Sequence, residues 1–473
     1  MSWLGTLCRF YLSRFNYFIL LLICLVIAGM PFCFFLLGLL SYDFSFDAFQ
    51  PVFNAWLWHN LWSTFGFDGI SLLLMLLVLF VFPICFFAVT FYNLTSSRLY
   101  FFFILIVLEL ILLCVFSFSN MLLFYISFEA TLIPMFILIG YFGARYRKIK
   151  AAYYLFFYTF IGSIFMLIGL LSLYFLTGSL SFYVVFHVSY TLVFQKVLWV
   201  LLFLTFAVKI PMVPFHIWLP EAHVEAPTTG SIILASILLK LGGYGFIRFS
   251  LGLVPAACLY FMPLVFTISL CGIVFASLST LRQIDIKRII AYSSIAHMNM
   301  AVLGLFLNNI YGLFGAVYLM LGHGLISSGL FFSIGVLYDR YHTRLLFYYG
   351  GLTAVMPLYA FCFLFLSFAN IGFPGTFNFI SELHIFLGVF KTSALLLFFA
   401  FIGFVFTVIY SIWLYNRMMF GTLKINYLFS FSDVNFFEFG VFILLIVFCL
   451  FFGFSTSFIV NFIHNWSVFL YVF

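Results

Sequence analysis

Runs of about 20 predominantly apolar residues follow one another along almost the whole chain. A run of this length crosses the hydrocarbon core of a bilayer as an α-helix, because a helix satisfies its backbone polar groups within the segment. Thirteen such runs lie at residues 17–40, 69–92, 99–117, 120–142, 151–177, 194–217, 228–251, 257–280, 286–307, 311–337, 354–388, 393–417 and 437–462. The sequence therefore predicts an all-α polytopic membrane protein with about 13 transmembrane helices.

The composition agrees with this class and excludes others. Hydrophobic residues make up 67% of the chain and charged residues 7%, whereas soluble domains contain about 25% charged residues. A net charge of +7 over 473 residues is too sparse for a nucleic-acid surface. The nine cysteines form no Cys-x-x-Cys pair and mostly lie inside apolar runs, which indicates small hydrophobic residues. If redox chemistry is involved, we expect another chain to hold the electron carrier.

The placement of basic residues predicts the orientation. With the N-terminus inside, most of the 19 lysines and arginines fall on inside segments, as the positive-inside rule requires. These inside residues are Arg9, Arg14, Arg98, Arg145, Arg147, Lys148, Lys150, Arg282, Lys287, Arg288, Arg340, Arg344, Arg417 and Lys424. The outside loops hold Lys196, Arg248 and Lys391. We expect residues 285–288 to form a solvated helix start on the inside.

Two of the thirteen runs are predicted to be broken helices. Pro211 and Pro214 follow Lys209 in the sixth run, and Gly372-Phe373-Pro374-Gly375 interrupts the eleventh. Each is the fourth member of a block of five, which predicts two inverted five-helix repeats (helices 3–7 and 8–12) with broken helices 6 and 11. The corresponding domains are residues 1–98 (N-terminal helices and an interfacial loop), 99–251 (first repeat), 257–417 (second repeat) and 418–473 (C-terminal helix).

Six ionisable residues lie deep inside these runs. They are Glu129, Lys209, Lys240, His297, His323 and Glu382. A charged side chain at the bilayer centre costs about 2.5–3.5 kcal/mol on insertion scales, so such residues normally face the bundle interior and mark ion pathways. One buried histidine alone is more often a core residue, and Glu129 with Lys209 could form a purely structural ion pair. Six groups at similar depth favour a pathway, with the proton as the favoured ion.

Polar neighbours accompany several of these residues at a spacing of four, which places them on one helix face. The pairs are Ser236 and Lys240, Ser293 and His297, His323 and Ser327, and Asn378 and Glu382. We therefore take Ser236, Ser293 and Ser327 as candidate accessory residues. Glu109 in helix 3 is a further candidate, either assisting Glu129 or facing a neighbouring subunit.

Four segments of the chain closely resemble the antiporter-like subunits of respiratory complex I. These segments are KIPMVPFHIWLPEAHVEAPTTGSIILASILLKLGGYGFIR, QIDIKRIIAYSSIAHMNM, GHGLISSGLFF and FPGTFNFISEL. The similarity covers about residues 67–420. It implies two inverted five-helix repeats around a hydrated axis. It also implies functional charges at Glu129, Lys209, Lys240 and Glu382, with His297 and His323 on the connecting path. Glu109 matches no motif of the family.

The resemblance also implies a function and a location. The chain is expected to translocate protons in the membrane arm of NADH:ubiquinone oxidoreductase, as a multi-pass protein of the mitochondrial inner membrane. The expected partners are other membrane-arm subunits, especially neighbouring antiporter-like subunits, and lipids, but no nucleic acid. NADH, FMN, iron–sulfur clusters and ubiquinone are expected in partner subunits and no cofactor in this chain. The 76 phenylalanines, where leucine would pack equally well, indicate a T-rich and hence organelle-encoded gene.

Two other functions remain open from the sequence. A free-standing cation/proton antiporter of the Mrp type shares the fold, and co-purification with quinone-reducing or with antiporter subunits would distinguish the two. A passive membrane scaffold would need none of the six buried ionisable groups.

Overall fold

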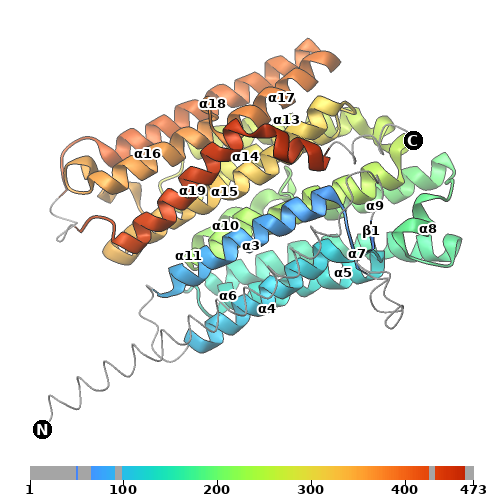
Figure 1. Ribbon diagram of the computed structural model, residues 1–473, viewed down its shortest axis with the longest axis horizontal. Coiled ribbons are helices and arrows are strands. Elements are labelled where there is room, and N and C mark those ends of the chain that lie inside the picture. The colour runs from blue at the N-terminus through green and yellow to red at the C-terminus, as the bar shows by residue number, and fades with distance from the viewer. Residues whose placement is uncertain (1–49, 52–64, 91–97, 425–431, 464–473) are drawn as a thin grey trace, which may run out of the picture.

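The computed structural model describes residues 50–51, 65–90, 98–424 and 432–463 (Figure 1). The predicted helix 17–40 and most of the loop 41–68 lie outside these residues. Within the described residues, ten helices are long and apolar enough to cross a membrane. The chain is therefore a mostly helical, multi-pass membrane protein.

The first half of the chain folds into helices that follow the predicted runs closely. A short antiparallel pair, β1 (Gln50–Pro51) and β2 (Gly66–Phe67), joins Gln50 to Phe67 and Pro51 to Gly66 just before α3. The helices are α3 (Gly69–Thr90), α4 (Arg98–Ser117), α5 (Met121–Ala130), α6 (Leu132–Gly140), α7 (Lys148–Thr177), α8 (Phe182–Phe186), α9 (Leu192–Lys209), the 3₁₀ turn η1 (Phe215–Ile217) and α10 (Trp218–Glu225).

The second half begins with one long helix that contains two π-helical segments. It runs as α11 (Thr228–Ile233), η2 (Leu234–Leu238, π), α12 (Leu239–Gly245) and η3 (Phe246–Leu251, π). The remaining elements are α13 (Pro255–Thr280), α14 (Ile286–Leu305), α15 (Ile310–Tyr341), the 3₁₀ turns η4 (Leu346–Tyr348) and η5 (Leu352–Ala354), α16 (Pro357–Ile371), α17 (Phe377–Thr392), α18 (Ala394–Met419) and α19 (Phe436–Phe454).

Both predicted helix breaks are present. Helix α9 ends at Lys209, and the chain resumes helical structure at η1 and α10 after the two prolines. Helix α16 ends at Ile371, Gly372 adopts a positive φ of 82°, and α17 starts at Phe377. Asn299 of α14 donates a hydrogen bond to the carbonyl of Pro211 at 3.5 Å, so a neighbouring helix partly satisfies the freed backbone at the first break.

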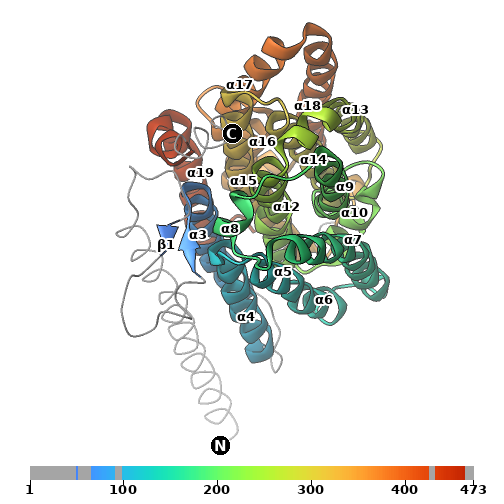
Figure 2. The ribbon, with the colours of Figure 1, turned by 90° about the vertical axis from the view of Figure 1, so that its right-hand side faces the viewer.

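The most buried helices occupy the middle of the bundle. Figure 2, which looks nearly along the helices, shows α12, α14 and α15 surrounded by the other helices. Helix α15 packs most closely against α14, α17 and α11. The segment 228–251 and α15 are each fully buried over their most apolar 18 residues. Lys240 and His323, which lie on these helices, are buried and therefore face protein and not lipid.

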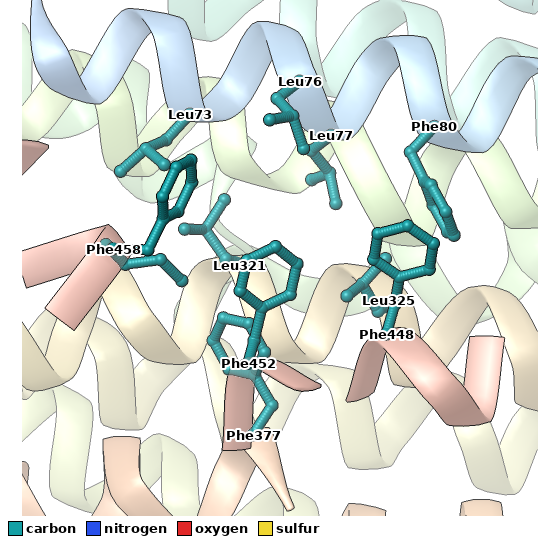
Figure 3. A pocket seen from close by; sticks show the side chains of 11 residues that line it. Leu73, Leu76, Leu77, Phe80, Leu321, Leu325, Phe377, Phe448, Phe452 and Phe458 are labelled. Carbon is teal, nitrogen blue, oxygen red and sulfur yellow. The ribbon is translucent and has the colours of Figure 1, made fainter. Parts of the chain in front are cut away.

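An apolar cavity of about 30 Å³ lies between α3, α19 and one face of α15 (Figure 3). Leu321 and Leu325 of α15 point into it, together with Phe377 of α17 and Phe448 and Phe452 of α19. A cavity without polar partners stays dry. His323 is two residues from both Leu321 and Leu325, and residues two apart lie on roughly opposite sides of a helix. His323 therefore points to the side of α15 opposite the dry cavity.

Two charge placements differ from the prediction. Arg248, expected in an outside loop, lies in η3, is buried, and forms an ion pair with Asp68 at 2.8 Å. Lys287, expected at a solvated helix start, is 3% exposed and donates a hydrogen bond to the carbonyl of Ala226 at 3.0 Å. Both predictions failed because the partner that stabilises each buried charge lies far away in sequence, where local hydropathy does not reveal it.

Candidate functional site

Lys209 lies at the first helix break and is almost fully buried. As the last residue of α9 it is near the negative end of the helix dipole, which favours a cation. Its Nζ has no hydrogen-bond partner among the described residues and lies 4.2 Å from the ring centroid of Phe128. Lys209 and the adjacent Glu129 act on each other electrostatically. They make no ion pair within 4.0 Å in the described part of the chain, so the predicted pair is close but open.

Lys240 lies just after the π-helical segment η2 and is fully buried. Its Nζ donates to the carbonyl of Ala235 and lies 2.8 Å from Nδ1 of His323. Segments of π-helix frequently occur at functional sites, where they change which backbone groups face a side chain. Lys240 thus joins the segment 228–251 to α15 through a polar contact in the middle of the bundle.

Beyond the contact between Lys240 and His323, a second histidine and a carboxylate extend the row of buried ionisable side chains. The rings of His323 and His297 have centroids 5.6 Å apart. Nδ1 of His297 lies 3.5 Å from Oε1 of Glu382 on α17. All three side chains are buried. The structure therefore brings four of the six predicted residues into one line, Lys240–His323–His297–Glu382, which we call the central line.

The three accessory serines lie beside this line and bond within their own helices. Ser236 donates to the carbonyl of Ile232 at 2.7 Å, and Ser293 donates to that of Ile290 at 2.8 Å. Ser327 donates more weakly to the carbonyl of Gly324 at 3.4 Å. Each hydroxyl oxygen can still accept a hydrogen bond. Whether these serines assist proton transfer stays a prediction.

Close helix packing positions Glu382. Gly372 lies so near it that a Cβ atom at this position would be 2.4 Å from Oε2 of Glu382. On the opposite side, a Cβ at Gly322 of α15 would lie 2.7 Å from Oδ1 of Asn378. Asn378 is fully buried, and neither polar atom of its side chain has a partner among the described residues. Glycines thus allow α15 and the break before α17 to surround this carboxylate.

Sequence reasoning missed several polar residues of the site. Tyr410 of α18 and Asn370 of α16 are buried, and Tyr410 interacts with Ser293, Asn370 and Glu382. Their isolated positions in otherwise apolar helices were a weak signal. Helix α18 was predicted, but the face that it turns inward was not.

His223 in α10 is also part of the site. It is fully buried, and its ring stacks on Phe331 with centroids 4.7 Å apart and an interplanar angle of 5°. Neither ring nitrogen has a hydrogen-bond partner among the described residues. His223 interacts electrostatically with Lys240 and Lys287. Sequence reasoning did not select His223, because it lies between the runs 194–217 and 228–251.

Glu109 lies on α4, which packs against α3 and also against α5, the helix that carries Glu129. Its carboxyl is 2% exposed and acts on Cys85 of α3. The groups that act on Glu129 are Lys209 and Ser163. No interaction among the described residues joins Glu109 to Glu129, and whether Glu109 assists Glu129 stays a prediction.

Comparison with known proteins agrees with this arrangement. Residues 119–409 match the family model described as NADH:quinone oxidoreductase/Mrp antiporter, TM. NADH-ubiquinone oxidoreductase chain 4 of Chondrus crispus is 48% identical over 424 residues, covering 90% of this chain and 86% of that protein. Chain 4 of Arabidopsis thaliana is 45% identical over 442 residues, covering 93% and 89%.

The structure is likewise similar to solved membrane complexes. A chain of respiratory complex I from Thermus thermophilus with bound NADH has a TM-score of 0.82 at 25% identity and covers 94% of both chains. A chain of the membrane-bound sulfane sulfur reductase, an archaeal respiratory membrane complex, has a TM-score of 0.75 at 21% identity, which is a likeness of fold. On these matches, the chain belongs to the NADH-ubiquinone oxidoreductase chain 4 family.

Proposed function

We propose that this chain is a proton-translocating subunit in the membrane arm of respiratory NADH:ubiquinone oxidoreductase. The chain 4 relatives, which match most of its length, support this assignment over an Mrp-type antiporter. Its location is the mitochondrial inner membrane, with the arginine- and lysine-rich side in the matrix, and its gene is organelle-encoded. It contacts other membrane-arm subunits, among them neighbouring antiporter-like subunits, and lipids. Partner subunits hold NADH, FMN, the iron–sulfur clusters and ubiquinone.

The central line is the observation that carries the proposal. An imidazole can accept a proton on one nitrogen and release one from the other. His323 and His297 therefore connect the ammonium group of Lys240 to the carboxylate of Glu382 through steps of 2.8 Å, 5.6 Å between ring centroids, and 3.5 Å. Nε2 of His297 has no partner in the described residues, and a water there completes a hydrogen-bonded path. Lys240 stores the proton, and Glu382 receives it.

The open Glu129–Lys209 pair supplies a switch. Two unit charges 4 Å apart interact by about 4 kcal/mol at an effective dielectric constant of 20. When the pair opens, as it stands in this structure, the charge of Lys209 is no longer offset by direct contact with Glu129. The electrostatic potential at Lys240 then rises, and this drives the stored proton from Lys240 toward His323. Quinone reduction in partner subunits drives the opening.

The proposed architecture has thirteen helices and two inverted repeats. The first repeat contains α4 to η3 and the second contains α13 to α18. The matching positions of the two broken elements, α9–α10 and α16–α17, support this assignment. The domain boundaries stated from the sequence follow the same division.

Lys240→Met tests the function. Methionine has a similar shape without a charge, so the complex should assemble while losing the proton store. We expect normal amounts of complex on native gels and a strong loss of NADH-driven proton uptake in sealed vesicles. Lys391→Met is the matched control, because Lys391 lies over the ring of Tyr311 at the end of α17, away from the central line. Normal pumping by an assembled Lys240→Met complex would refute the proposal.

A further inference from the structure

A small polar cavity lies at the basic side of the membrane, where α3, α11, α15 and α19 meet. It measures about 10 Å³, and its polar lining comes from Thr228, Asp339 and Glu438. A cavity of about 10–15 Å³ can hold one water when two to four polar groups face it. Gly335 shapes its wall, since a Cβ there would lie 2.7 Å from Cγ2 of Thr228. This cavity therefore has the size and lining for one bound water.

The two carboxylates at this cavity differ in their surroundings. Glu438 has a structural role: it completes a capping box at the start of α19 and binds Arg340 through both oxygens, at 2.6 and 3.3 Å. The side chain of Asp339 makes no hydrogen bond to the described residues, and the residue is exposed. It lies in the last turn of α15, where the helix dipole disfavours an anion. Helix stability therefore does not explain an aspartate at this position.

Lys287 is a buried cation that acts on Asp339 and makes no ion pair within 4.0 Å among the described residues. The charged and titratable groups that act on Asp339 are Lys287 of α14, Glu438 of α19, and Arg340 and His342 of α15. Glu438 already holds Arg340. The Nζ of Lys287 is buried and bonds to one backbone carbonyl, that of Ala226. Glu225 and Arg344, which lie 4.0 Å from each other, also act on Lys287.

His223 connects this region to the central line. It interacts electrostatically with both Lys287 and Lys240, and it also acts on His323. Its two unpartnered nitrogens are fully buried against Phe331 of α15. Each of these titratable groups therefore interacts electrostatically with the next, in the order Asp339, Lys287, His223 and Lys240.

We propose that Asp339 is the proton-uptake residue on the basic side. Its carboxylate takes a proton from the aqueous phase and releases it to water in the cavity. That proton passes to Lys287 after Lys287 has given its own proton inward through His223 to Lys240. In each transfer one N–H or O–H bond forms as another breaks, so no other reactant is needed. This inference rests on the proposed function and adds the residues that supply its proton store.

Asp339→Asn is the test, made in the assembled complex in sealed vesicles. Asparagine keeps the shape but cannot bind the proton, so uptake should slow most when protons are scarce. Electrostatic focusing changes capture rates by about 10- to 1,000-fold, and we expect about a tenfold slower rate at pH 8. The difference should shrink as the pH falls to 6. Asp339→Glu, which restores a carboxylate, should recover most of the rate.

Asp433→Asn is the matched control. Asp433 lies on the same side of the membrane, its carboxylate accepts hydrogen bonds from the backbone N–H groups of Leu358 and Tyr359, and it does not line the cavity. If loss of any surface charge slowed uptake, both variants would show it equally, and the inference would be wrong. Unchanged uptake at pH 8 in Asp339→Asn would also overturn it. The proposed function would still stand if Lys240→Met abolished pumping in the same assay.

Discussion

Lys209 and Lys240, the two lysines deep inside predicted transmembrane runs, have different surroundings. Lys209 has no hydrogen bond in the described residues and contacts an aromatic ring, whereas Lys240 contacts a carbonyl and an imidazole. The sequence identified both from their depth in apolar runs, because the cost of a buried ammonium group depends on depth alone to first order. It could not say which lysine would be partnered. That depends on how α5, α9 and α15 pack, and no local pattern encodes this.

Glu109→Gln addresses a buried carboxyl outside the central line. Glu109 acts on Cys85 and not on Glu129, so we expect the variant to pump protons at the rate of the unmodified complex. Glutamine preserves the shape and removes a group that is costly to bury as a charge. The measurement is proton uptake per NADH oxidised, beside the amount of assembled complex. Reduced uptake with normal assembly would restore the role of assisting Glu129.

At the scale of elements, the broken helices were predictable and the π-helical segments were not. Proline and glycine interrupt a helix through backbone chemistry that is visible in the sequence. The segments η2 and η3 contain ordinary helix-compatible residues, and their wider turns arise from tertiary packing. Buried contacts such as Lys287 to Ala226, 61 residues apart, were missed for the same reason. The helix start at Asp285 was therefore interpreted as solvated.

Gly372→Ala tests the second break. Alanine at a positive φ costs about 1–2 kcal/mol, and here its Cβ would also collide with the carboxylate of Glu382. We expect lower thermal stability of the complex together with slower proton uptake, because Glu382 must move. Gly421→Ala is the control: its φ is also positive, at 96°, but a Cβ there meets nothing within 4 Å. Equal effects of the two variants on proton uptake would show that displacement of Glu382 is irrelevant.

At the scale of the whole molecule, the central line crosses between the two proposed repeats. Lys240 belongs to the first repeat, whereas His323, His297 and Glu382 belong to the second, and the 2.8 Å contact of Lys240 with His323 joins them. Ten helices and the two breaks follow from hydropathy and proline placement. The contact between the repeats cannot be predicted in this way, because it depends on how two units far apart in sequence dock.

Replacing His297, in the middle of the central line, is the direct test of proton transfer along that line. His297→Phe keeps a ring of similar size between His323 and Glu382 but removes both nitrogens that can carry a proton. His384→Phe is the matched control, because His384 lies on the same helix as Glu382 and bonds the carbonyl of Ile380 in its own helix. The measurement is protons taken up per NADH oxidised by assembled complex in sealed vesicles. If protons pass through His297, the ratio should be clearly lower for His297→Phe and unchanged for His384→Phe. An unchanged ratio for His297→Phe would contradict proton transfer along this line.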